Sequence, residues 1–272
     1  MTDTKRITLG PRETQLLFAL ESRQADLFTP REAARILRVP VGVASDVIYR
    51  LRGKGRVIEV RKGEYLLVPA RAGIGAGWSE SIFRTVDAVV REGYYVGFWS
   101  AMNYWGMTEQ VPRVVHVVTA NRRRPFRFQG QRVQFVTMRP DRIFGTVRES
   151  SGRGSFSISD RERTLVDALL LPRYCGGVGE AAKALAETGR ELRWERLGAY
   201  VRRLGVDAVT RRLGYLLELL DLQAPLRRRF RREFRGFRWL DPSAPRQRLG
   251  YSKEWGLILN VTQEELLPPG RP

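Results

Sequence analysis

The sequence is poor in the side chains that most often carry catalysis or bind metal ions. It has one cysteine, Cys175, and one histidine, His116, among 272 residues. A single cysteine allows neither an internal disulfide nor a cysteine metal cluster. We expect no metal site and no cofactor. Serine-histidine catalysis would depend wholly on His116. That histidine alternates with Val114 and Val118 in a valine-rich run, where a core or edge position is expected.

Motifs for nucleotide-dependent and nuclease chemistry are missing as well. The sequence has no Glu-x-Lys pair of the restriction-nuclease type and no G-x-x-x-x-G-K-[ST] phosphate loop. Gly154-Ser155 followed by Asp160 and Glu162 is superficially similar to a nucleotidyltransferase site, but the spacing is too short. A helix-capping box over Ser159 to Glu162 explains the same residues. We therefore expect no catalytic residue and no enzyme activity.

Long apolar runs are absent too. No stretch approaches the roughly 20 apolar residues that a membrane helix needs. The apolar segment Leu16 to Leu20 is too short and too late for a signal peptide. With one cysteine, the chain is compatible with a reducing cytosol, and we expect a cytoplasmic protein without a membrane partner.

Negative charge is scarce. The chain has 48 Lys and Arg against 29 Asp and Glu, a formal charge of +19 and a pI of about 11.0. This balance favours an anionic partner, nucleic acid before membrane. Residues 1–70 hold 13 basic and 8 acidic side chains, or +5, which leaves +14 for the remainder. Most of the positive charge thus lies outside the N-terminal part.

The N-terminal part carries the pattern of a winged helix. Thr29-Pro30-Arg31-Glu32 combines a capping box with a proline at the first helical position. Two apolar stripes interrupted at Val39 to Gly42 predict two short helices around a tight turn. Val57 to Val60 and Tyr65 to Val68 are strand-like runs. They are joined by Arg61 to Glu64, which includes a glycine that suits a hairpin turn.

The second of these helices is the expected reading element for double-stranded DNA. Its apolar side chains recur at helical spacing and would face inward, which leaves polar and cationic groups outward. Such groups suit the base edges and phosphates of a major groove. A winged helix that serves only as a protein-contact scaffold is the alternative. The predicted DNA contacts are Ser45, Tyr49, Arg50, Arg52 and Lys54, with Arg61 and Lys62 at the tip of the wing.

Beyond the winged helix, assigned to residues 1–70, we expect a linker at 71–77 and a larger domain at 78–272. Phe98, Met102 and Trp105 recur at helical spacing, which favours a buried core helix over a base-stacking platform. Short runs of period two predict an antiparallel sheet of four or five strands. These runs are Arg113–Thr119, the segments on either side of Gln129-Gly130, Ile143–Val147 and Ser155–Ile158, with Trp255–Val261 completing the sheet after several helices.

The expected fold is therefore mixed, of the α+β class: an N-terminal winged helix-turn-helix and a C-terminal antiparallel sheet with several helices. A dense basic segment, residues 227–238, mixes arginines with aromatic residues and suits a nucleic-acid backbone with exposed bases. A solvated basic face that its aromatics anchor to the core is an equal alternative.

The order of these features resembles the AbiEi family, the abortive-infection antitoxins of type IV toxin-antitoxin systems, which act in phage defence. Besides the winged helix, the resemblance rests on Gly97 to Gln110, on Arg163-Thr164-Leu165-Val166-Asp167 and on Lys253-Glu254-Trp255-Gly256. It covers nearly the whole chain. Arg163 and Asp167 are four residues apart, so they lie on one helical face and can pair with each other.

The resemblance implies a DNA-binding antitoxin that represses its own operon at inverted repeats in the promoter. Its C-terminal domain would counteract a nucleotidyltransferase-like toxin without a stable complex. The alternatives are a stand-alone winged-helix transcription factor with a ligand-sensing or protein-binding C-terminal domain, and an unrecognised nucleic-acid-processing enzyme. The predicted antitoxin surface comprises Arg122, Arg123, Arg124, Arg163, Asp167, Arg227, Arg228, Arg231 and Arg232.

Overall fold

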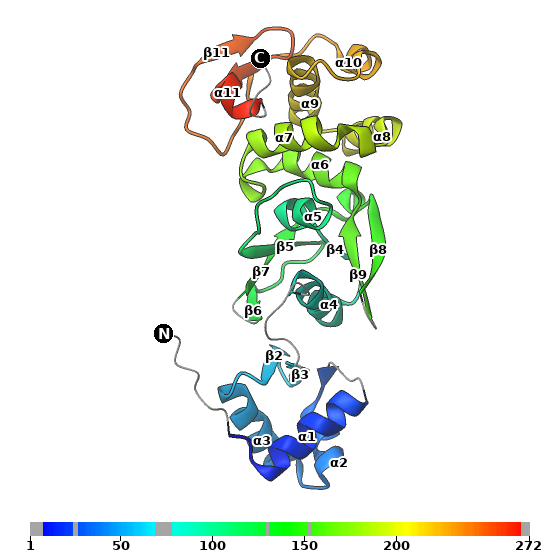
Figure 1. The fold of residues 1–272 in the computed structure, drawn as a ribbon, viewed down its shortest axis with the longest axis vertical. Helices are drawn as coiled ribbons and strands as arrows, with labels where there is room; N and C mark the ends of the chain where they lie inside the picture. The colour runs from blue at the N-terminus through cyan, green and yellow to red at the C-terminus, as the bar shows by residue number, and fades with distance from the viewer. Residues whose placement is uncertain (1–7, 24–26, 69–77, 129–130, 152–153, 268–272) are drawn as a thin grey trace. The chain divides into compact units, whose positions relative to one another are not determined.

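The computed structural model describes residues 8–23, 27–68, 78–128, 131–151 and 154–267. The chain forms two compact units (Figure 1): an N-terminal unit of residues 1–91 with 126–130, and a C-terminal unit of residues 92–125 with 131–272. The linker predicted at 71–77 lies outside the described residues. Within the described ranges, no helix is long and apolar enough to cross a membrane.

The N-terminal unit contains the winged helix-turn-helix that the sequence predicts. Its small sheet has the strand order β1-β3-β2 with antiparallel pairing. Helix α4 (Trp78–Val90) and strand β6 (Phe126–Phe128) also belong to this unit. The elements of the winged helix are α1 (Pro11–Ser22), β1 (Leu27–Phe28), α2 (Pro30–Leu37), α3 (Val41–Gly53), β2 (Val57–Arg61) and β3 (Glu64–Leu67).

Local sequence signals explain where these elements begin and end. Thr29 and Glu32 form the predicted reciprocal cap of α2, at 3.3 Å from the Glu32 amide to the Thr29 hydroxyl and 2.7 Å from the Thr29 amide to the Glu32 carboxylate. Between β2 and β3 the turn uses Gly63 at φ +74°, a backbone conformation that favours glycine. The core of the winged helix contains the apolar face of α3, namely Ala44, Val47, Ile48 and Leu51.

The main sheet of the C-terminal unit is mixed and not purely antiparallel. Its strands lie in the order β7-β5-β4-β9-β8. The pairs β4/β5 and β8/β9 are antiparallel as predicted, whereas β5/β7 and β4/β9 are parallel. Parallel pairs arise because the chain returns to the end where β5 begins before it enters β7, and enters β9 at the opposite end, where β4 begins. The strands are β4 (Tyr94–Val96), β5 (Val114–Thr119), β7 (Gln131–Thr137), β8 (Thr146–Ser151) and β9 (Gly154–Ser159).

Two predicted strands differ from the structure. The strand expected at Ile143–Val147 begins only at Thr146, because Gly145 adopts a φ of +68° after a short 3₁₀ turn. The strand expected at Trp255–Val261 is shorter and does not complete the main sheet. Instead, β12 (Leu257–Leu259) pairs with β10 (Arg238–Trp239) and β11 (Gly250–Ser252) in a separate sheet. The turn expected at Gln129-Gly130 lies outside the described residues.

Helices make up the rest of the C-terminal unit and enclose its core (Figure 1). In α5, Phe98 and Met102 are 0% exposed, which confirms the core helix and excludes base stacking on Phe98. The helices are α5 (Phe98–Tyr104), α6 (Arg161–Leu170), α7 (Val178–Thr188), α8 (Trp194–Leu204), α9 (Asp207–Leu219), α10 (Ala224–Phe230) and α11 (Gln263–Leu266).

The segment that follows α10 is fixed to α9 by buried side chains. Trp255 is fully buried against α9, where any Cβ at position 214 would collide with its ring, so Gly214 permits the close approach. Arg211 of α9 donates hydrogen bonds of 2.6–2.9 Å to the carbonyls of Arg235, Gly236 and Gly256. Its neighbour Arg212, also buried, donates to the carbonyls of Leu169, Trp239 and Leu240.

Candidate nucleic-acid interface

The outward face of α3 presents the polar groups that the sequence assigns to DNA reading. Tyr49 is 77% exposed, and the side chains of Arg50 and Arg52 are about half exposed. Ser45 is exposed one turn earlier and donates its hydroxyl to the carbonyl of Val41 at 2.9 Å. A phenol, a hydroxyl and two guanidiniums are therefore accessible on one helix of a winged-helix fold.

The cationic groups of this face differ in how they are held. Lys54 donates to the Glu13 carboxylate at 2.6 Å and to the Thr8 carbonyl at 2.8 Å. Arg50 lies 3.5 Å from the same carboxylate, and Arg52 lies 2.6 Å from Glu59. Because Glu13 is only 3% exposed, its pairing with Lys54 connects the end of α3 to the start of α1. Lys54 thus has a structural partner that the sequence analysis did not identify.

Glu13 is held in its charged form. Burial by itself raises the pKa of this carboxyl, but hydrogen bonds from Lys54 and from the Gly10 amide, with the charge of Arg50, bring the pKa below its ordinary value. The anion therefore persists at neutral pH and keeps Lys54 in place.

The tip of the wing lies between β2 and β3. Lys62 is exposed there, while the side chain of Arg61 lies outside the described residues. Glu64, at the start of β3, accepts a hydrogen bond from Arg91 at 2.8 Å. Among the side chains that the structure describes at this tip, Lys62 is the exposed cation that can contact a phosphate.

Arg163 and Asp167 do not belong to a surface. Both side chains are 0% exposed in the core of the C-terminal unit, so their predicted place in an exposed antitoxin surface is wrong. The pairing predicted from their spacing is present, since Arg163 Nη2 lies 2.8 Å from Asp167 Oδ1. Two charged residues in a sequence usually suggest a surface position. Here both side chains can be buried because each charge compensates the other.

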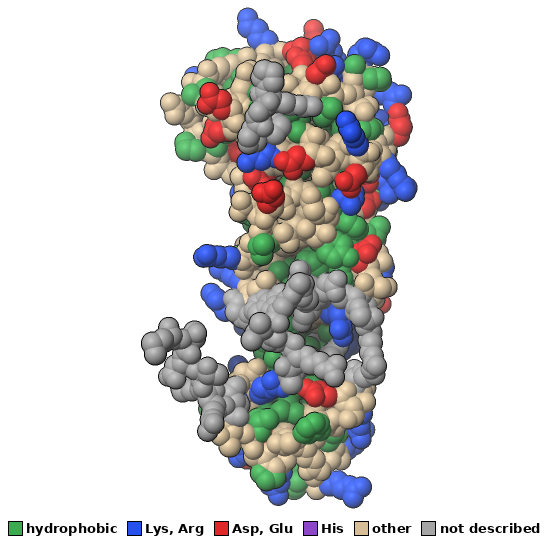
Figure 2. Space-filling model, viewed as in Figure 1, with side chains coloured by type: hydrophobic (Ala, Val, Ile, Leu, Met, Phe, Trp, Pro, Cys, Tyr) green, Lys and Arg blue, Asp and Glu red, His purple; other side chains and the backbone are tan. Residues whose placement is uncertain are grey.

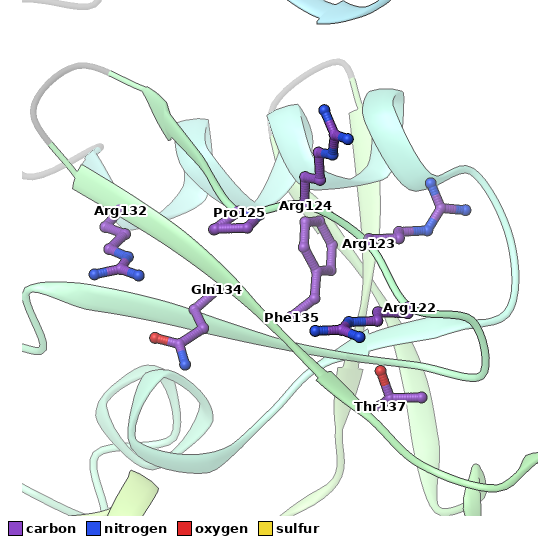
Figure 3. A pocket seen from close by; sticks show the side chains of 8 residues that line it. All are labelled: Arg122, Arg123, Arg124, Pro125, Arg132, Gln134, Phe135 and Thr137. Atoms are coloured by element: carbon purple, nitrogen blue, oxygen red, sulfur yellow. The ribbon is translucent and has the colours of Figure 1, made fainter.

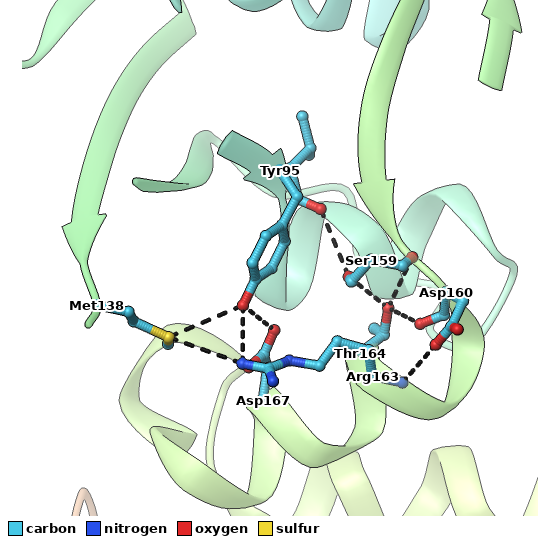
Figure 4. Close-up of polar contacts among 8 residues, drawn as sticks. Tyr95, Met138, Ser159, Asp160, Arg163, Thr164 and Asp167 are labelled. Atoms are coloured by element: carbon cyan, nitrogen blue, oxygen red, sulfur yellow. Dashed lines mark hydrogen bonds and ion pairs between the residues drawn. The ribbon is translucent and has the colours of Figure 1, made fainter. Parts of the chain in front are cut away.

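Tyr95 closes this buried group into a triad (Figure 4). Arg163 Nη2 donates to the Tyr95 hydroxyl at 2.9 Å, and that hydroxyl donates to Asp167 Oδ2 at 3.0 Å. The guanidinium carbon of Arg163, Cζ, lies over the ring of Phe144, 4.4 Å from its centroid. Burial and the adjacent carboxylate hold the pKa of Tyr95 well above its ordinary value, so the phenol keeps the proton that it donates. Geometry and burial together assign this triad to stability of the fold.

The start of α6 differs in detail from the predicted capping box. Asp160, and not Ser159, caps the helix by accepting the amide hydrogen of Arg163 at 2.7 Å. Glu162 turns away and accepts from the Arg193 amide at 2.6 Å. Both carboxylates, of Asp160 and Glu162, thus have structural hydrogen-bond partners.

His116 is the core histidine that the sequence predicts. It is 8% exposed and packs against Tyr174, with 4.8 Å between ring centroids. Burial lowers its pKa to about 4, so the ring is neutral at physiological pH. Among the described residues, no group of three or more His, Cys, Asp or Glu is placed to hold a metal ion.

The basic segment at 227–238 has its own counter-ions. Arg229 pairs with Glu195 at 2.9 Å and Arg232 with Asp207 at 2.6 Å. Arg227 pairs with Asp221, and Arg231 with Glu218 and Glu254. Figure 2 shows red side chains among the blue ones over the helices of this unit. Phe230 is buried whereas Phe237 is 44% exposed, so only some of the aromatic side chains anchor this face to the core.

Arg122, Arg123 and Arg124 lie in a different setting. They follow β5 and line a pocket of about 550 Å³ together with Arg132 of β7 (Figure 3). Arg132 was not among the predicted site residues. Arg132 lies near the start of β7, seven residues after Pro125, and the turn expected at Gln129-Gly130 could have indicated this proximity.

Comparisons with known proteins agree with this architecture. Residues 15–68 match the sequence model of the transcriptional regulator of AbiEi antitoxins, and residues 95–219 match that of the AbiEi antitoxin C-terminal domain. Among solved structures, the crystal structure of the RV2827C protein from Mycobacterium tuberculosis has the same fold. It superposes with a TM-score of 0.67 at 14% identity, over 95% of this chain and 94% of that one. None of the curated protein sequences matches the chain.

Proposed function

The chain belongs to the AbiEi antitoxin family, and on that premise we propose that it represses its own operon and counteracts a nucleotidyltransferase-like toxin. In this proposal the winged helix binds inverted repeats in the promoter, with one copy of the protein on each half-site. The C-terminal unit supplies the antitoxin activity, without a stable complex with the toxin. The cytoplasm, where the promoter lies, is the proposed compartment.

The exposed face of α3 carries the DNA-binding part of this proposal. Tyr49 and Ser45 offer hydrogen-bonding groups that can meet base edges. Arg50 and Arg52 add charge on the same helix, and Lys62 adds charge on the wing. The ion pairs of the two arginines do not prevent this role, because exposed pairs contribute only about 0 to 1 kcal/mol and can be exchanged for phosphate.

Binding to a labelled duplex of the promoter, followed by fluorescence anisotropy across a salt series, tests this part. Replacing Arg50 and Lys62 together by alanine is expected to weaken binding to all sequences and to lower the salt slope by about 2. Arg12→Ala, an exposed arginine on α1, is the charge control. Unchanged promoter binding by the double variant would reject the assignment.

A growth assay tests the antitoxin part separately. The full chain is expressed from an unrelated promoter beside the toxin of the neighbouring gene. The Arg50→Ala/Lys62→Ala variant is expected to restore growth as well as the unaltered protein does. Expression from an unrelated promoter does not depend on repression of the operon, so loss of DNA binding should not matter in this assay. Loss of rescue in this variant would show that toxin control requires DNA binding. Affinity capture under the same conditions is expected to recover the antitoxin without the toxin.

A stand-alone transcription factor with a ligand-sensing C-terminal unit is the second candidate, and the pocket at Arg122 to Arg132 favours it. The two candidates differ in one genetic observation. A neighbouring toxin gene that this chain neutralises supports the first, whereas promoter binding that responds to a small ligand, without such a gene, supports the second.

A further inference from the structure

The pocket on the C-terminal unit is built by the return of the chain after β5. Strands β5 and β7 run parallel, with Thr119 opposite Thr137 at one end and Val114 opposite Arg132 at the other. The hydroxyl of Thr119 donates to the Asn121 carbonyl at 2.8 Å and fixes the start of the returning segment. In Figure 3, Arg122 lies beside Thr137, and Pro125 lies toward Arg132. The pocket is lined by Arg122, Arg123, Arg124, Pro125, Arg132, Gln134, Phe135 and Thr137.

This lining has an excess of positive charge. Its described residues include four arginines and no carboxylate. A second basic hollow, at residues 231–235 with 253–254, offers the comparison, because its lining contains Glu233 and Glu254 among the cations. There Arg231 pairs with Glu254 and Arg232 with Asp207. The lining of the pocket beside β7 thus differs from that of the other basic hollow in having no carboxylate among its residues.

The chemistry of the lining favours phosphate over other anions. A guanidinium presents a planar fork of N–H donors that matches two phosphate oxygens at once, and several forks in one concavity suit a chain of phosphates. Gln134 and Thr137 add neutral hydrogen-bonding groups, while Pro125 and Phe135 add apolar surface. A volume of about 550 Å³ suits a ligand of nucleotide size. A DNA duplex, whose phosphates lie on a convex surface, does not enter such a space.

We propose that this pocket binds a nucleotide unit, with its phosphates on the arginines and its base or sugar against Pro125 and Phe135. The same chemistry has two sources, a free nucleoside triphosphate and the 5′-phosphorylated end of a single-stranded RNA. This site is separate from the α3 face and does not depend on promoter binding.

Isothermal titration of the full-length protein at physiological salt tests the site with four probes: ATP, pyrophosphate, an RNA octamer with a 5′-phosphate and the same octamer without it. The site variant is Arg124→Gln/Arg132→Gln. Its matched control is Arg246→Gln/Arg248→Gln, which removes the same charge from another exposed loop. Saturable binding of ATP or of the phosphorylated octamer is expected. The site variant should weaken it about tenfold or more, in line with the loss of charge-assisted hydrogen bonds, and the control should leave it unchanged.

The probes also separate the two sources. Binding of ATP supports a free nucleotide, and preference for the phosphorylated octamer over both ATP and the unphosphorylated octamer supports an RNA end. The proposal is overturned if neither ATP nor the phosphorylated octamer binds saturably, if pyrophosphate binds as tightly as the nucleotides, or if the control variant loses as much affinity. If the double variant does not fold, the affinity of the single variant Arg132→Gln for the same probes is measured in its place. Promoter affinity measured on the same variants shows whether α3 function is intact.

Discussion

Lys54, directly after α3, places its ammonium 2.6 Å from the carboxylate of Glu13 in the first turn of α1. The side chain of Glu13 is 4% exposed, and the lysine side chain retains 32% exposure. A residue chosen from the sequence as a DNA contact thus has a partner within the fold. Lys62, at the wing tip, is exposed. Replacing Lys54 should therefore lower the free energy of unfolding more than replacing Lys62.

Lys54→Met is expected to destabilise the N-terminal unit by about 1 to 3 kcal/mol, since it leaves a buried carboxylate with fewer donors. Lys62→Met should change stability by no more than about 0.5 kcal/mol while it weakens promoter binding. Urea unfolding and anisotropy on both variants check this. The assignment is wrong if Lys54→Met affects DNA binding alone and leaves unfolding unchanged.

Acid should destabilise the C-terminal unit through His116. Burial lowers the pKa of this histidine from 6.5 to about 4, so between these values the unfolded chain binds the proton more readily than the folded one. Stability from the neutral ring is complete above about pH 6.5 and falls as the pH drops toward 4. The loss at pH 5 is on the order of 2 kcal/mol.

Thermal unfolding of His116→Phe and of the unaltered chain at pH 7.5, 6 and 5 measures this effect. The phenylalanine variant should show a smaller decrease across the series, because it has no proton to take up. Equal decreases in both proteins would mean that other groups, and not His116, govern stability in this range.

Asp167→Asn should destabilise the C-terminal unit by about 3 to 5 kcal/mol, because it leaves the Arg163 guanidinium buried beside a neutral group. The double replacement Arg163→Met/Asp167→Leu should recover part of that loss, since it removes both charges. Denaturant unfolding of the three proteins measures the difference. A folded Asp167→Ala variant that loses a metal-dependent activity on nucleic acid would instead give this aspartate a catalytic role.

Gly214→Ala should destabilise the chain by about 1 to 3 kcal/mol or more, because the added methyl group collides with the buried ring of Trp255. Gly42→Ala is the matched helical control. No atom lies within 4 Å of a Cβ at that position. Its effect should be neutral or stabilising by up to about 1 kcal/mol. If Gly214→Ala is as stable as the control variant, the Trp255 ring can move to make room for the methyl group, and the prediction is wrong.

Local signals made the winged helix predictable. The capping pair Thr29 and Glu32 and the glycine of the wing act over three or four residues, so the sequence alone places them. The spacing of Arg163 and Asp167 likewise predicted their pairing. It did not predict their burial, because burial depends on Tyr95 and Phe144, which other segments of the chain supply.

Long-range pairing explains what the sequence could not predict. The parallel register of β5 with β7 depends on how the whole sheet assembles, and the spacing of apolar residues within one strand does not show which strand will lie beside it. The counter-ions of the basic segment at 227–238 were hidden for the same reason, since Glu195 and Asp207 come from earlier helices.

The carbonyls that Arg211 and Arg212 bind lie mostly beyond residue 219, where the match to the antitoxin C-terminal domain ends. Detaching the later segment would strip two buried guanidiniums of most of their acceptors at once, at a cost far above that of a frayed terminus. The segment from Arg235 to Gly256 should consequently unfold in one cooperative step with α9. Hydrogen exchange of the backbone amides in β10 and β12 should therefore be no faster than that of α9.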